Sequence, residues 1–165
     1  MRFMRRAAGL AAGAGLLAGA AVGTAAPAHA FGSELTWSAY TYDTDDCPCT
    51  LIDPIDNTYF QYDAGGKAVK VSFRVSGSYT GKMEFHPSGE KIWLYDSKAD
   101  GDTYYLRFSY TVPGGGDTVT SSVYSPRGGV GPTVDLDIPE GWPVTVTVYD
   151  DAAGTDRIGS WTGIG

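Results

Sequence analysis

The chain has 165 residues, of which 42% are hydrophobic and 13% aromatic, and its formal net charge is −7. This length suits one domain with a single core. The acidic balance argues against nucleic acid and against anionic membrane surfaces as partners.

The first 30 residues have the pattern of a secretory signal peptide. Arg2, Arg5 and Arg6 precede a run rich in Ala, Gly and Leu, and the segment ends in Ala28-His29-Ala30. This order predicts export and cleavage after Ala30. A transmembrane anchor is the alternative, but the run contains more Gly and Ala than Leu and Ile.

Cleavage would leave residues 31–165 as the mature protein. Three of the 12 basic residues leave with the leader and all 19 acidic residues stay, so the mature net charge is −10. We therefore expect a secreted, extracellular, monomeric single domain with no nucleic-acid or membrane partner.

Short alternating segments, separated by Gly, Pro and Asp, make up the mature chain. The segment 104–112 is the clearest, because every second side chain from Tyr104 to Val112 is apolar and predicts a packed face. No segment has the 3.6-residue period of a helix over three turns. The sequence therefore predicts an all-β fold, a single antiparallel β-sandwich of about eight or nine strands. Strands are expected in the segments 34–42, 58–62, 67–75, 79–86, 91–95, 104–112, 118–124, 134–138, 144–149 and 158–164.

The two cysteines, Cys47 and Cys49, are separated by a single proline. An exported chain meets an oxidising compartment, so a local disulfide is expected. Linkage of two chains through these cysteines and thiolate metal binding are the alternatives. A bridge across one residue closes almost no loop and adds little stability, so the fold must depend on its core.

Catalysis has little support in the sequence. His86 is the only histidine after the leader, and no G-x-S-x-G turn occurs. Asp135 and Asp137 lie two apart on one strand face, as a glycosidase could use, but a solvated face explains them equally well. We expect a protein that is not an enzyme and needs no cofactor, with calcium as the one candidate ion.

Aromatic side chains offer a binding function. Five of them lie on strand faces opposite the aliphatic rows: Tyr40, Tyr42, Trp93, Tyr95 and Tyr105. Flat rings on an open face can stack on sugars or pack on a protein partner, and burial in a second core layer is the alternative. The sequence thus favours a secreted, non-catalytic binding module for an extracellular glycan or protein surface.

Two acidic loops flank neighbouring strands of the expected fold. Asp96, Asp100 and Asp102 precede the segment 104–112, and Asp150, Asp151 and Asp156 follow the segment 144–149. Antiparallel pairing would bring these loops to one edge, where the end of the first strand, with Asp43, Asp45 and Asp46, could join them. Calcium takes six to eight oxygen ligands, which converging loops can supply. The alternative is that these aspartates only form turns.

Parts of the sequence resemble two groups of known proteins. Two stretches resemble the acidic loops of a C2 domain, a calcium- and membrane-binding β-sandwich. They are Asp96 and Asp102 with Tyr104, and residues 144–150 with Asp156-Arg157-Ile158-Gly159. That resemblance implies calcium at the loops. More broadly, the Ala99-Asp100-Gly101 turn and the closing Trp161 resemble a loose group of small exported actinobacterial β-sandwich proteins of unknown function, which implies export and a sandwich.

A secreted enzyme inhibitor is a further alternative. Its reactive segment would be the flexible connection 125–132, which is rich in Gly and Pro.

Overall fold

A computed structural model describes residues 31–50, 59–127 and 132–165. These residues form eleven strands and two short 3-10 helices, η1 and η2, without any α-helix. None of them belongs to a helix long and apolar enough to cross a membrane. The elements are η1 (Gly32–Glu34), β1 (Leu35–Asp43), η2 (Thr44–Asp46), β2 (Cys49–Thr50), β3 (Tyr59–Phe60), β4 (Lys67–Val75), β5 (Ser78–His86), β6 (Lys91–Asp96), β7 (Tyr105–Thr111), β8 (Thr118–Thr120), β9 (Val134–Asp135), β10 (Pro143–Tyr149) and β11 (Arg157–Ile164).

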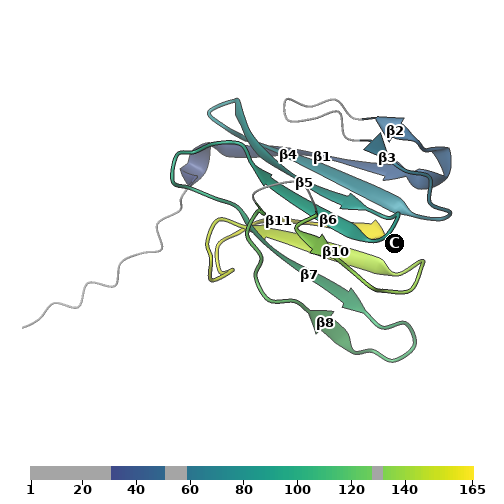
Figure 1. The fold of residues 1–165 in the computed structure, drawn as a ribbon. Coiled ribbons are helices and arrows are strands. Elements are labelled where there is room, and N and C mark those ends of the chain that lie inside the picture. Colours follow the sequence, from purple (N-terminus) through teal and green to yellow (C-terminus); the bar gives the residue numbers. More distant parts are fainter. Residues whose placement is uncertain (1–30, 51–58, 128–131) are drawn as a thin grey trace, which may run out of the picture.

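Nine strands form one antiparallel sheet that curls along its length (Figure 1). The strand order is β8-β7-β10-β11-β4-β5-β6-β9, and β1 pairs with β4 along its whole length. The two halves of the sheet join where β11 meets β4, through the single pair Ile164 and Lys67. The predicted all-β, antiparallel fold is confirmed. A two-layer sandwich is not, because the hydrogen bonds connect both halves into a half-barrel.

Most predicted strands occur at their expected positions, and 67–75 coincides with β4. The segment 118–124 is shorter than predicted: β8 ends at Thr120, and only Tyr124 forms a further bridge, to Leu106. The segment 134–138 is also shorter, because Leu136 already bonds to the Glu90 carbonyl in an irregular path. The two-residue strand β2 has no counterpart in the prediction.

One core lies inside the curl and draws on both halves of the sheet. Tyr104, which is fully buried, stacks between Phe31 at 4.4 Å and Phe73 at 4.7 Å between ring centroids. Its hydroxyl lies 2.6 Å from that of Thr80. The predicted packed face is confirmed from Tyr104 to Phe108, whereas Tyr110 and Val112 are only half-buried. Trp161 is half-buried and packs against this core.

Glycine allows the two halves to meet at the corner. A Cβ on Gly163 of β11 would lie 2.2 Å from the ring of Phe85 and 2.6 Å from the carbonyl oxygen of Lys67. Atoms this close overlap, so only a residue without a side chain lets β11 approach β4 and β5 here.

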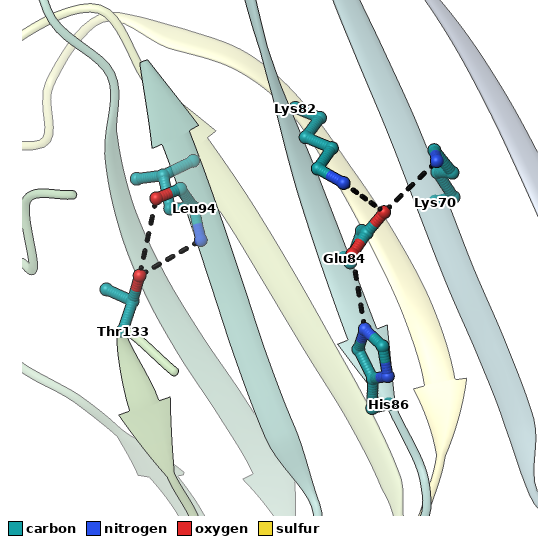
Figure 2. Close-up of polar contacts among 6 residues, drawn as sticks. All are labelled: Lys70, Lys82, Glu84, His86, Leu94 and Thr133. Carbon is teal, nitrogen blue, oxygen red and sulfur yellow. Dashed lines mark hydrogen bonds and ion pairs between the residues drawn. The ribbon is translucent and has the colours of Figure 1, made fainter. Parts of the chain in front are cut away.

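Beside β6, the side chain of Thr133 makes backbone hydrogen bonds of the kind that a neighbouring strand would make (Figure 2). Its Oγ1 accepts a hydrogen bond from the backbone N–H of Leu94 at 2.9 Å and donates to the Leu94 carbonyl at 3.5 Å. Thr133 is buried, so these bonds satisfy backbone groups that water does not reach.

A small second cluster contains the cysteine pair. Cys47 and Cys49 lie at disulfide distance, with Cα atoms 4.4 Å apart, as the local pairing predicted. Cys47 packs with Phe60 of β3 and Ala68 of β4. Cys47 and β3 therefore lie over the outer face of the sheet.

Candidate functional site

The outer face of the sheet, opposite the core, carries an unusual polar row. Residue pairing across β1, β4, β5 and β6 aligns Tyr40, Lys70, Glu84 and Trp93. Charged side chains are rarely buried, yet Lys70 is 2% exposed and Glu84 fully buried. Lys82, on the next row, is also fully buried.

Glu84 is the centre of this buried cluster (Figure 2). Its Oε1 lies 2.9 Å from Nζ of Lys82 and 3.2 Å from Nζ of Lys70, and its Oε2 lies 3.2 Å from Nε2 of His86. Burial by itself would raise the pKa of Glu84, but the hydrogen bond from His86 and the charges of the two lysines outweigh it and lower that pKa. The carboxylate is therefore ionised at neutral pH.

An ionised carboxylate can only accept hydrogen bonds, so Nε2 of His86 must donate to Glu84. This bond fixes the tautomer and the orientation of the imidazole. The ring of Phe60, 4.7 Å away between centroids, packs against His86 from the side of β3. His86 is consequently a rigid group and not a freely rotating strand end.

A cavity of about 250 Å³ opens beside this cluster. Its walls come from β3, from the turn after β5 and from β6, and they consist of Tyr59, Gln61, His86, Ser88, Lys91 and Trp93. The ring of Trp93 lies 6.1 Å from that of His86 and is stacked on Tyr95 at 6.0 Å, with an angle of 4° between planes. Nζ of Lys82 lies 4.7 Å from the centroid of Tyr95. The buried cluster thus supports an aromatic platform.

The cavity combines two kinds of group. Trp93 and Tyr59 present apolar ring surface, and Gln61, His86 and Ser88 present hydrogen-bonding atoms. A ligand with one apolar face and several hydroxyl groups would satisfy both kinds.

Four of the five predicted aromatic residues lie on one face of the sheet, but on strands that are not neighbours. Tyr40, Tyr42, Trp93 and Tyr95 share the outer face of β1 and β6, although only Trp93 lines the cavity. Tyr105 is separate, because β7 is divided from β4 by β10 and β11. Sequence reasoning missed Tyr59, Gln61, Ser88 and Lys91, which lie in or beside β3 and between the end of β5 and the start of β6, in segments without a motif of their own.

The acidic loops meet as predicted, but three of their carboxylates, those of Asp96, Asp100 and Asp151, form hydrogen bonds within their own loops. Strands β7 and β10 are antiparallel neighbours, with Tyr105 opposite Tyr149, so the loops share one edge. Asp96 accepts from the backbone N–H of Lys98, and Asp100 accepts from that of Asp102. These are turn-forming bonds.

Asp151 has the same role in its own loop. Its carboxylate accepts the backbone N–H groups of Asp156 and Thr155 and the Thr155 hydroxyl, at 2.7–2.8 Å. These hydrogen bonds lower the pKa of Asp151, and the one from the backbone of Asp156 has the largest effect. Among the residues that the structure describes, no group of three or more His, Cys, Asp or Glu side chains is arranged to hold a metal ion.

The end of the first strand does not join this edge. Asp43 pairs with Lys67, which also pairs with Ile164 at the far end of β11, whereas Asp150 lies before the start of β11. The idea that Asp43, Asp45 and Asp46 contribute to the acidic loops is wrong, because β1 runs antiparallel to β4 and carries its end to the opposite side. The proposed inhibitor segment 125–132 includes residues 128–131, which lie outside the described residues.

Comparisons with known proteins found no matching family model, no matching curated protein and no matching solved structure.

Proposed function

We propose that the protein is a secreted, non-catalytic binding module that holds a sugar ring of an extracellular glycan against Trp93. The observation that carries this proposal is the cavity in which the Trp93 ring lies beside hydrogen-bonding groups of Gln61, His86 and Ser88. Aromatic rings stack on the apolar face of a sugar, and fixed polar side chains then select its hydroxyl groups.

The size of the cavity favours a glycan over a protein surface. Pockets for drug-sized ligands span about 300–1,000 Å³, and this one, at about 250 Å³, suits a single ring unit. Specific protein interfaces instead bury about 800 Å² on each partner. One small polar hollow is a poor basis for such contact.

The buried cluster supports binding by holding its groups in place. Glu84 orients His86, and Tyr95 packs against Trp93 with its ring nearly parallel. Groups that are already fixed lose little conformational entropy when a ligand binds. This small entropy loss matters for sugar binding, because each contact to a sugar hydroxyl only replaces a hydrogen bond to water with one to the protein.

Export is part of the proposal. The leader-like sequence of residues 1–30 and the cysteine pair at disulfide distance are both typical of an extracellular chain. We also propose that the two halves of the curled sheet act as the layers of a sandwich, with the sugar site on the outer face of one layer. Calcium at the acidic loops is not part of this function.

Retention on a panel of insoluble glycans and cell-wall preparations tests the proposal. Wild-type protein should be retained on at least one, and Trp93→Ala should lose at least about fivefold in affinity, since the stacking of one planar base on an aromatic side chain contributes about 1–3 kcal/mol. Tyr40→Ala is the matched control: Tyr40 is 53% exposed on the same face, but about 14 Å from Trp93 across three strand spacings. Absence of retention on every preparation, or equal loss in both variants, would refute the proposed site.

A further inference from the structure

Phe31 is anchored in the core although it directly follows the predicted cleavage point. Its side chain is 7% exposed and stacks on Tyr104. Its backbone nitrogen donates a buried hydrogen bond to Oδ2 of Asp150 across 3.1 Å. The atom that cleavage would convert into an amine therefore already lies against a carboxylate.

Asp150 is itself held in a fixed, enclosed position. It is 8% exposed and directly follows β10, where the pairing with β11 shifts at a bulge. Its backbone N–H donates to the Asp156 carbonyl at 2.8 Å. A carboxylate removed from water in this way is strongly stabilised by a cation with good geometry.

The charges around this position are mostly negative. A cavity of about 170 Å³ adjoins it, and Asp156 and the exposed Arg157 contribute to its walls with Asp150 and Gly32. On the other side, Asp96 and Asp100 act on Tyr104 together with Asp150 and reinforce the effect of burial, which raises the Tyr104 pKa. In this cavity the two carboxylates of Asp150 and Asp156 outnumber the single guanidinium, so the charge beside the Phe31 nitrogen is net negative, which favours a positive charge there.

We infer that cleavage after Ala30 creates an α-ammonium group on Phe31 that forms a buried ion pair with Asp150, which makes Asp150 the receptor for the processed N-terminus. The inference rests on the export that forms part of the proposed function. In the cleavage, water adds across the Ala30–Phe31 amide: its hydroxyl goes to the Ala30 carbonyl carbon and its hydrogen to the Phe31 nitrogen. The new amine then takes a proton from solvent. A charged pair thereby replaces a neutral amide hydrogen bond, so processing strengthens the fold.

The sign of the pH dependence follows from this pair. Nearby carboxylates favour the charged amine and outweigh its desolvation, so its pKa in the folded state should exceed the ordinary value of about 7.7–8.0. A folded-state pKa above the unfolded one gives stabilisation that is complete below about pH 7.7 and is lost as pH rises through the folded-state pKa.

Two chains that differ by one residue test the pair. Every described strand and the core cluster lie within residues 31–165, so a chain that starts at Phe31 and one that starts at Ala30 both contain the fold. The pH dependence of α-amine acetylation by a limiting reagent gives the pKa of each amine. The Phe31 chain should have a pKa at least one unit higher, which means a reaction at least about sevenfold slower at pH 7.5.

Variants separate the charge effect from simple burial. Asp150→Asn in the Phe31 chain should return the amine to its ordinary pKa, and Asp100→Asn, at an exposed neighbour, should leave it nearly unchanged. The Phe31 chain should also lose thermal stability between pH 8 and 10, and the Ala30 chain should not. If Asp150→Asn does not fold, the comparison of the Phe31 and Ala30 chains still shows whether the Phe31 amine has a raised pKa.

Equal amine pKa values in the two chains would overturn the inference. N-terminal sequencing of the product exported from the full chain should give Phe31, and any other start would also overturn it. Glycan retention involves none of these residues, so its failure would count against the sugar site alone.

Discussion

Replacement of Glu84 by Gln tests the buried cluster that supports the proposed site. The change keeps the size of the side chain but removes a charge that Lys82 and Lys70 contact at 2.9 and 3.2 Å. Both lysines are almost completely buried, so loss of this carboxylate is costly. Breaking a buried pair from one side typically costs about 3–5 kcal/mol, which corresponds to a fall of about 10–18 °C in Tm for a domain of this size. Urea unfolding at pH 7 measures the loss directly.

Acid titration gives the matching control. The Glu84 pKa is lowered in the folded state, so its stabilisation is complete above the ordinary value and is lost as pH falls through the folded-state pKa. The difference in the free energy of unfolding between wild type and Glu84→Gln should therefore become smaller below about pH 4.5. A matched exposed change, Glu140→Gln, should cost less than about 0.5 kcal/mol. A loss below about 1 kcal/mol in Glu84→Gln would refute the reasoning, since even an exposed ion pair reaches that value.

Three further predictions concern the fold. Thr133→Val should cost about 1–3 kcal/mol in urea unfolding, because it leaves a buried strand amide without its acceptor, and Thr133→Ser should retain most of the stability. Gly163→Ala should lower Tm by several degrees, because the new methyl group overlaps the ring of Phe85, at a cost of about 1–3 kcal/mol. A milder effect would mean that the corner of the sheet relaxes. Intact mass should increase by about 2 Da on reduction if Cys47 and Cys49 pair within one chain, whereas a reducible dimer would contradict the pairing.

The strands were predictable because alternation is a local property of the sequence. The segment 104–112 shows this, since every second side chain from Tyr104 to Phe108 is buried as expected. The curl of the sheet was not predictable, because it depends on one contact between strands distant in sequence, where Gly163 lies against Phe85. Alternation identifies the two faces of a strand but does not show how the halves of a sheet join.

The site was predictable only in part, for a related reason. Trp93 stood out as an aromatic residue on the strand face opposite the aliphatic row, and the structure places it in the cavity wall. Lys70, Lys82 and Glu84 follow the pattern of a solvated face, yet they are buried. Their burial is a tertiary effect, because β3 packs on this face, as the contact of Phe60 with His86 shows. Such packing leaves no periodic pattern in the sequence.

The most direct test of the sugar site is the indole N–H signals of the four tryptophans in an NMR titration with soluble oligosaccharides. Trp37, Trp142 and Trp161 lie outside the cavity and act as internal controls. The account predicts that a bound oligosaccharide moves the Trp93 signal and leaves the other three nearly unchanged. A glycan that is retained by the protein but leaves the Trp93 signal in place, or moves only the signals of the other tryptophans, would contradict it.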